Sequence, residues 1–290
     1  MKILVTGGAG FIGTNLIKRL VKDGHQVMSL DDYSTGLVEN EVEGAFYEEC
    51  DIEDTAYFPL DKSFDLVYHL AARARIQPSF DQSKDYYRVN VKGTERIANE
   101  CAFYGIPMIH AGTSSVHAGK DKNPYTYSKY IAEEVLQYYG RYNSLTFAVA
   151  RFYNVYGPYQ LIGGEYATLI GKWIHNIKHG EPCVIYGDGE QRRDFTHVDD
   201  IVAALIKMGE TIDDFNGIME NRFYELGRGQ SFSVNNVAQM FEIIPVYKEG
   251  RPGEARTTLA DYSEAKSLLG WEPKINLPDY IYSLKSTLLL

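Results

Sequence analysis

Cysteine, basic charge and long hydrophobic runs are all scarce in this sequence, and each scarcity excludes a class of protein. The 290 residues include only three cysteines, which are far apart and lack the spacing of a metal site. Scattered cysteines in an odd number are typical of a reducing compartment, so we expect a cytoplasmic protein. No hydrophobic run is long enough to span a bilayer, and the first residues read as a strand, not as a signal peptide. We therefore expect no metal and no membrane partner.

Acidic residues outnumber basic ones. There are 29 Lys and Arg against 39 Asp and Glu, a formal net charge of -10. An acidic chain is poorly suited to bind a polyanion, so we expect no nucleic-acid partner. An anionic small ligand would need a local cluster of Arg or Lys. The length allows one large domain or two unequal ones.

The first thirty residues predict a strand, a glycine turn, a helix and a second strand that ends on Asp31. Gly7 and Gly10 allow a sharp turn and a close approach to a bulky anion, and Gly13 lets the helix lie tight on the strand. Free N–H groups at the helix start suit a pyrophosphate. A carboxylate at Asp31 suits an adenosine ribose diol, and with Asp32 it would repel a 2′-phosphate. We therefore predict NAD as the cofactor, not NADP.

Strands then alternate with helices up to about residue 158, which predicts a Rossmann-like, doubly wound parallel α/β sheet. Ligands of such sheets bind beyond the carboxyl ends of the strands. Asp51, which follows the expected third strand, suits either an adenine amino group or a helix N-cap, and both readings stay open. Further strands are expected at 45–47, 64–72, 106–111 and 146–152, and helices at 85–104 and 125–142.

Beyond residue 158 the alternation becomes irregular and glycines are frequent. We predict an NAD-binding domain over 1–158 and a smaller α/β substrate-binding region over 159–290. A helical pattern over 195–208 looks able to return to the main sheet, so the large domain is expected to receive 195–210 as well.

Tyr125 and Lys129 stand four residues apart at the start of a predicted helix and share one face of it. An ammonium beside a phenol favours the phenolate, which predicts a lowered pKa for Tyr125 and a general base. Lys129 can also hold the nicotinamide ribose. Thr113, at the end of the preceding strand, can share the substrate oxygen. The same spacing at Tyr262 and Lys266 follows no such strand, and we interpret it as a chance match.

Eight short motifs occur together over nearly the whole chain. They are TGGAGFIG at 6–13, HLAA at 69–72, NVKGT at 90–94, YxxxK at 125–129, RFYNVYGP at 151–158, RRDFTHVDD at 192–200, RPG at 251–253 and LGWEP at 269–273. With these motifs the sequence resembles the extended short-chain dehydrogenases/reductases, in particular the nucleotide-sugar epimerases of the UDP-glucose 4-epimerase kind. The resemblance implies a nucleotide-diphosphate sugar as substrate and NAD as cofactor. It also suggests a homodimer formed through the helices at 85–104 and 125–142.

The resemblance and the strand ends together give a set of expected site residues. Catalysis is expected from Thr113, Tyr125 and Lys129. Cofactor contacts are expected from Gly7, Gly10, Phe11, Ile12, Gly13, Asp31, Asp51, Ile52, Leu70, Ala71, Ala72, Asn90, Tyr125, Lys129 and Tyr153. Substrate contacts are expected from Thr113, Ser114, Ser115, Asn154, Arg193 and Arg251. The two arginines would hold the diphosphate, and salt bridges with Asp194 and Glu254 are the alternative for them.

The residues after Thr113 bear on the reaction. In this family acids at these positions accompany elimination of water, and a Glu accompanies decarboxylation, whereas here they are Ser114 and Ser115. We therefore predict C4 epimerisation through a 4-keto sugar, with Tyr125 as base. The alternatives are a nucleotide-sugar oxidoreductase, dehydratase or decarboxylase of the same family, and a non-catalytic NAD-sensing protein.

Three features depart from the family pattern or invite another reading. Residues 116–119 read Val-His-Ala-Gly where Val-Tyr-Gly is usual, and Glu225 stands where Asn is common. His117 is either a substrate contact or an exposed loop residue, and we favour the latter. His175 and His179 share a helix face, but no third metal ligand is evident, so we interpret them as solvated.

Overall fold

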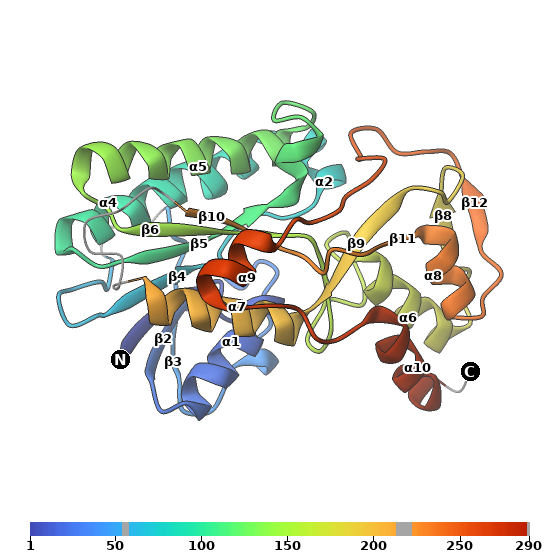
Figure 1. Ribbon diagram of the computed structural model, residues 1–290, viewed down its shortest axis with the longest axis horizontal. Helices are drawn as coiled ribbons and strands as arrows, with labels where there is room; N and C mark the ends of the chain where they lie inside the picture. The colour runs from blue at the N-terminus through green and yellow to red at the C-terminus, as the bar shows by residue number, and fades with distance from the viewer. Residues whose placement is uncertain (54–57, 213–221, 289–290) are drawn as a thin grey trace.

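The protein is built on one seven-stranded parallel sheet with helices on both faces (Figure 1). The computed structural model describes residues 1–53, 58–212 and 222–288. The strand order is β10-β6-β5-β4-β1-β2-β3. The strands are β1 (Lys2–Thr6), β2 (Gln26–Asp31), β3 (Phe46–Glu49), β4 (Leu66–His69), β5 (Met108–Thr113), β6 (Phe147–Phe152) and β10 (Arg222–Leu226). This order reverses direction between β1 and β4, where doubly wound sheets bind their ligands. The predicted fold is confirmed.

Two hydrophobic cores lie on the two faces of this sheet. One face packs on α1 (Phe11–Lys22), α7 (Val198–Thr211) and α9 (Ser263–Leu269). The other packs on α4 (Thr94–Tyr104) and α5 (Pro124–Asn143). Both faces of the central strands, such as β4 and β5, are therefore buried, which explains their nearly continuous hydrophobic runs.

Local signals place α5, the helix that carries Tyr125 and Lys129. The Asn123 side chain accepts a hydrogen bond from the Thr126 N–H, and Pro124 occupies the first turn. Both features are typical of a helix start. Tyr125 therefore lies in the first turn of α5, at the edge of the sheet where β5 ends.

A smaller region covers the carboxyl edge of the sheet (Figure 1). Its core includes Trp173 and Phe241, both fully buried. The division into domains at residue 158 stays a prediction, and β10 and α9 from the later part of the chain belong to the large sheet and its core. The elements of the smaller region are β7 (Asn154–Tyr156), β8 (Val184–Tyr186), β9 (Arg192–His197), β11 (Ser231–Ser233), β12 (Val246–Lys248), α6 (Leu169–His179), α8 (Val234–Met240) and α10 (Leu277–Leu288).

Two expected helices differ from the structure. The predicted helix over 195–208 is wrong for its first three residues, because they belong to β9, which pairs with β7 and β11. The predicted helix over 85–104 is divided into α3 (Ser83–Tyr87), a π-helical turn η2 (Arg88–Gly93) and α4. A π turn inside an α-helix shifts the side chains that follow it, and such turns are common at functional sites. The remaining short helices of the described residues are α2 (Ile76–Asp81) and the 3₁₀ helices η1 (Val38–Asn40) and η3 (Ser114–Ala118).

Within the described ranges no helix combines the length and the apolar character needed to cross a bilayer. The same ranges contain no group of three His, Cys, Asp or Glu side chains placed to hold a metal ion. His175 and His179 stack with ring centroids 4.1 Å apart, and the His179 Nδ1 lies 2.8 Å from the His175 carbonyl oxygen. They act as a local helix contact in this structure.

Candidate active site

A cavity of about 840 Å³ opens at the carboxyl ends of the sheet strands, between the sheet and the smaller region. It is lined by every expected site residue except Asn90. Residues of β2, β5, β6 and α5 and of the loops after β1 and β4 line the sheet side, and residues from α6, β8 and β9 line the other side. One cavity thus joins the expected cofactor and substrate positions.

The glycine turn forms a cradle that a side chain would fill. Gly7 has φ +74°, and a Cβ there would lie 2.8 Å from the Ala71 backbone nitrogen. A Cβ on Gly13 would lie 2.2 Å from the Gly7 carbonyl oxygen. The backbone of the turn is therefore open to a bulky group at the start of α1, as a dinucleotide pyrophosphate requires.

Asp31 ends β2 beside this cradle. One carboxylate oxygen accepts the Ala9 N–H at 2.9 Å, and the other accepts the Tyr33 N–H at 2.9 Å. Burial, the largest influence, raises the pKa of Asp31, although both hydrogen bonds oppose it. The side chain is thereby fixed in orientation, with lone pairs left for a ribose diol.

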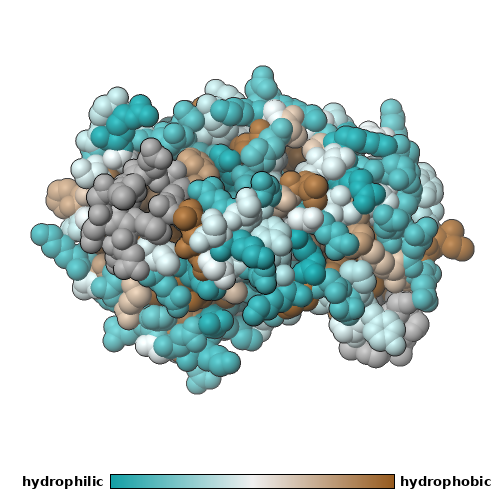
Figure 2. Space-filling model, in the orientation of Figure 1, coloured by the Kyte–Doolittle hydropathy of each residue, from teal (hydrophilic) through white to brown (hydrophobic). Residues whose placement is uncertain are grey.

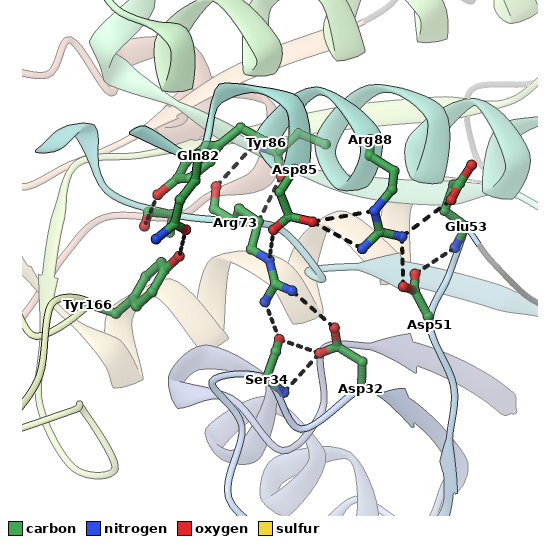
Figure 3. Close-up of polar contacts among 12 residues, drawn as sticks. Asp32, Ser34, Asp51, Glu53, Arg73, Gln82, Asp85, Tyr86, Arg88 and Tyr166 are labelled. Atoms are coloured by element: carbon green, nitrogen blue, oxygen red, sulfur yellow. Dashed lines mark hydrogen bonds and ion pairs between the residues drawn. The ribbon is translucent and has the colours of Figure 1, made fainter. Parts of the chain in front are cut away.

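Asp51 is engaged by the chain itself (Figure 3). Its Oδ2 lies 2.7 Å from Arg88 Nη1, and its Oδ1 accepts the Glu53 N–H at 3.0 Å. These partners lower its pKa, although burial opposes them. Asp51 and Ile52 both line the cavity. A contact with adenine stays a prediction, and the N-cap alternative depends on residues 54–57, which lie outside the described residues.

Asn90 lies in the π turn, fully buried behind the loop that follows β4. Its Oδ1 accepts the Arg73 N–H at 2.8 Å, and its Nδ2 donates to the Arg73 carbonyl at 3.0 Å and to Ser128 Oγ at 2.9 Å. In this structure Asn90 therefore positions the loop between β4 and α2, which carries Ala71 and Ala72 toward the cavity.

Tyr125 differs from expectation in its ionisation. Burial raises the pKa of its phenol, while a hydrogen bond with Thr113 and the nearby Arg75 charge lower it. The expected lowering of the pKa by Lys129 is wrong here, because the Lys129 Nζ lies 3.2 Å from His110 Nε2 and burial lowers the Lys129 pKa to about 8. The Lys129 ammonium contacts the buried His110 under α5, and nothing in the sequence indicated this partner.

His110 is held neutral by burial, which lowers its pKa well below the usual value. A neutral imidazole can accept from an ammonium only at its unprotonated nitrogen, so Nε2 accepts from Lys129 and the proton lies on Nδ1. Among the described residues His110 Nδ1 has no hydrogen-bond partner. The imidazole therefore orients Lys129 without adding charge to the site.

Thr113 and the serines after it form a network of hydroxyls. Thr113 Oγ1 accepts the Ser115 N–H at 3.2 Å and lies 3.0 Å from Ser115 Oγ. Thr126 donates to Ser115 Oγ at 3.0 Å. The Thr113 hydroxyl is thus fixed beside Tyr125, and no acidic side chain occupies positions 114 or 115.

Cations gather at the far end of the cavity. Arg193 Nη2 lies 3.3 Å from Glu254 Oε2, which is one of the two partners weighed from the sequence. The Arg251 guanidinium lies over the Tyr186 ring, 3.4 Å from its centroid. Lys172, which the sequence analysis missed, lines the same end, and Asn154 faces it from β7.

The two departures from the family pattern meet in space. His117 Nε2 lies 2.9 Å from Glu225 Oε1, and Glu225 Oε2 accepts the Tyr153 hydroxyl at 2.9 Å. Arg151 joins Glu225 at 3.1 Å and Glu133 at 2.7 Å. His117 is about half exposed, as expected, but it is tied to the network behind Tyr153. No sequence spacing signals a pair 108 residues apart.

The family model described as "NAD dependent epimerase/dehydratase family" matches residues 3–221. The chain belongs to this family. A putative UDP-glucose 4-epimerase of Methanocaldococcus jannaschii is 31% identical, over 96% of this chain and 95% of that protein. A Thermotoga maritima UDP-glucose 4-epimerase, solved with UDP-glucose, superposes with a TM-score of 0.87 at 30% identity, covering 99% of this chain and all of that one.

Other family members vary in substrate and reaction. A UDP-glucuronate 4-epimerase of Thermodesulfobacterium geofontis is 31% identical, over 95% of this chain and 92% of that protein. UDP-glucuronic acid decarboxylase 4 of Arabidopsis thaliana is 29% identical, over 96% of this chain and 66% of that protein. The identification as an extended short-chain dehydrogenase/reductase enzyme of the nucleotide-sugar epimerase kind is confirmed, and so is NAD as its cofactor.

Proposed function

We propose that this enzyme interconverts the C4 epimers of a uridine diphosphate sugar. The observation that carries the proposal is the grouping of Tyr125, Thr113 and Lys129 at one end of the cavity, with hydroxyls and no acid at the two positions after Thr113. Epimerisation at C4 needs one base and one hydride acceptor. The relatives named as UDP-sugar 4-epimerases support the choice of nucleotide.

Tyr125, Thr113 and Lys129 are proposed to have separate roles in the reaction. Tyr125 accepts the proton of the sugar O4 hydroxyl, and Thr113 bonds the same oxygen and keeps it in line. The hydrogen bond with Thr113 and the charge of Arg75 oppose the burial that disfavours a phenolate at Tyr125, and Lys129 is proposed to hold the nicotinamide ribose. NAD, when bound, supplies the hydride acceptor and the hydride donor. After the 4-keto sugar turns over, Tyr125 returns the proton to O4, so there is no net oxidation.

Arg193, Arg251 and Lys172 are proposed to hold the diphosphate, and Asn154 to lie beside it. Two of these cations, Arg251 and Lys172, form no ion pair with a carboxylate within the described part of the chain. Paired phosphates suit such a cluster, because arginine forks match phosphate oxygens. Dehydration and decarboxylation remain the second reading, and the hydroxyls at 114 and 115 favour epimerisation over both.

Incubation of the purified protein with UDP-sugars, without added cofactor and followed by proton NMR, tests the proposal. A new C4 epimer without accumulating NADH supports it. A keto, decarboxylated or oxidised product contradicts it and identifies the other family reaction. Bound NAD with no turnover of any UDP-sugar contradicts it in favour of a sensing protein.

We also propose a cytoplasmic homodimer formed through α4 and α5. These helices carry exposed aromatic side chains on the outer surface, notably Phe103, Tyr138 and Tyr142. Exposed aromatic rings on neighbouring helices are typical of interfaces between proteins. The split into a cofactor domain at 1–158 and a substrate region at 159–290 is proposed on the same family basis.

A further inference from the structure

Arg75 has a backbone conformation that suits glycine. It precedes α2 with φ 100° and ψ 139°. A residue with a Cβ is strained in this conformation, and such strain is concentrated at binding and active sites. Glycine would relieve it. The presence of arginine at this position therefore points to a use for its side chain.

Tyr86 fixes this conformation and connects it to the base. Its hydroxyl donates to the carbonyls of Ala74 at 3.0 Å and Arg75 at 2.9 Å, and Figure 3 shows Tyr86 on the helix above this loop. The Tyr86 ring is fully buried and meets the Tyr125 ring edge to face, with centroids 6.2 Å apart. Arg75 and Tyr125 are thus held by one side chain.

The Arg75 guanidinium lines the cavity without a counter-ion from the chain. Its Nε donates to the Tyr166 carbonyl at 2.6 Å. No carboxylate of the described residues forms an ion pair with it, whereas its neighbour Arg73 pairs with Asp85 at 2.7 Å and Asp32 at 3.5 Å (Figure 3). A half-buried cation without an anion is unfavourable, so Arg75 is suited to an anion that arrives with the ligand.

Arg75 lines the same cavity as Tyr125, Lys172 and Arg251. Burial lowers the pKa of Lys172 and the charges of Arg251 and Arg75 lower it further, while at Tyr125 the charge of Arg75 opposes the burial that raises the pKa. Arg75 therefore lies within reach of both the diphosphate cations and the base. That is the stretch of the cavity between the proposed diphosphate and the C4 oxygen, which the hexose must occupy.

We propose that Arg75 binds a carboxylate carried by the hexose, and that the enzyme acts on acidic UDP-sugars in preference to neutral ones. This inference rests on the proposed function for the position of the hexose. A guanidinium binds a carboxylate through two parallel hydrogen bonds, and the two terminal nitrogens of Arg75 are the pair that suits it. A neutral sugar leaves the cation unpaired, which provides the discrimination. The carboxylate is either C6 of a uronate or a lactyl ether at C3.

The test compares UDP-glucuronate, UDP-N-acetylmuramate, UDP-glucose and UDP itself. Binding to the NAD-loaded wild type, Arg75→Gln, Arg75→Lys and Arg75→Gly is measured by calorimetry, together with kcat/KM where turnover occurs. We expect the wild type to bind one acidic sugar at least tenfold more tightly than UDP-glucose. Arg75→Gln should remove that preference and leave UDP affinity unchanged, and Arg75→Lys should restore part of it. Arg75→Gly checks folding, because it relieves the backbone strain.

The outcomes separate the possible anions. Preference for UDP-glucuronate assigns the carboxylate to C6, and preference for UDP-N-acetylmuramate assigns it to C3. Equal binding of acidic and neutral sugars by the wild type overturns the inference. It is also overturned if Arg75→Gln loses as much affinity for UDP alone as for the acidic sugars, because Arg75 would then bind phosphate. Because binding is read without turnover, failure of C4 epimerisation leaves this test intact.

Discussion

At the scale of the residue, Tyr125 should account for the proton step of the reaction. Replacing Tyr125 with Phe removes the phenol oxygen that shares a hydrogen bond with Thr113. We expect kcat to fall by about 10²–10⁴-fold, the usual contribution of a positioned acid–base group. NAD content, read from the absorbance of released nucleotide, should stay at the wild-type level. Turnover at the wild-type rate in this variant would rule out Tyr125 as the base.

Lys129 predicts a pH dependence of stability in the protein freed of nucleotide. Its pKa is lowered from 10.5 to about 8 by burial. Between these values the unfolded chain holds a proton that the folded chain has lost, so stability rises with pH across this window. Relative to Lys129→Met, the wild type should gain about 2 kcal/mol in free energy of unfolding between pH 7.5 and 9.5. Urea titrations of both proteins measure it, and a constant difference would contradict it.

Some site residues could be proposed from the sequence because their spacing along the chain indicates a role. Others could not, because their role depends on residues that are close only in the folded protein. Tyr125, Thr113 and Asp31 follow from strand ends and helix spacing. His110, Lys172 and the Arg75 backbone do not. The hydrogen-bond partner of the buried Lys129 is set by the residues packed under α5, and the positive φ of Arg75 is set by the loop around it. Neither can be read from spacing along the chain.

At the scale of the element, the buried pair of Glu133 and Arg151 joins α5 to β6. Arg151 donates to both Glu133 oxygens, at 2.7 and 3.2 Å, and Glu133 is almost fully buried. Glu133→Gln should reduce the free energy of unfolding by about 2 kcal/mol, as for a lost hydrogen bond between charged groups. It should also lower the pKa of Lys129 further, because Glu133 raises it.

The neighbouring Glu134→Gln is the matched control, because Glu134 lies on the exposed side of the same helix. Its stability should stay within about 0.5 kcal/mol of the wild type. Equal effects of the two substitutions in thermal or urea unfolding would show that the pair does not stabilise α5.

Helices and strands with a clear period were predictable, and their junctions were not. The helix from 195 was wrong at its start because Phe195, Thr196 and His197 pair with β7, and only the fold supplies that partner strand. The π turn at 88–93 could not be predicted, because it lies in an otherwise regular helical pattern of residues. Its role appears only in the fold, where Asn90 accepts the Arg73 N–H and holds that loop.

At the scale of the whole molecule, the surface predicts where a second copy binds. The face seen in Figure 2 is mostly hydrophilic, with hydrophobic residues in small separate groups. Phe103 is 76% exposed on α4, and Tyr138 is 56% exposed on α5. Replacing both with Asp should shift the mass measured by light scattering from dimer to monomer.

Phe46→Asp is the control for the dimer prediction, since Phe46 is 63% exposed on β3, away from these helices. It should keep the wild-type mass. A monomeric wild type, or a dimer that survives both substitutions on α4 and α5, would contradict the proposed interface.

The seventh strand of the sheet, β10, affects how the protein folds during synthesis. β10 pairs with β6, and the buried Trp271 donates from its indole to the Asp200 carbonyl at 2.8 Å, under the same face. The sheet that bears the cofactor site is thus completed by residues far past its last Rossmann helix. During synthesis the sheet can close only after β10 has left the ribosome, so a nascent chain cut before β10 would expose the edge of β6. A chain cut between β10 and Trp271 would have the complete sheet but would lack Trp271 from the core on that face.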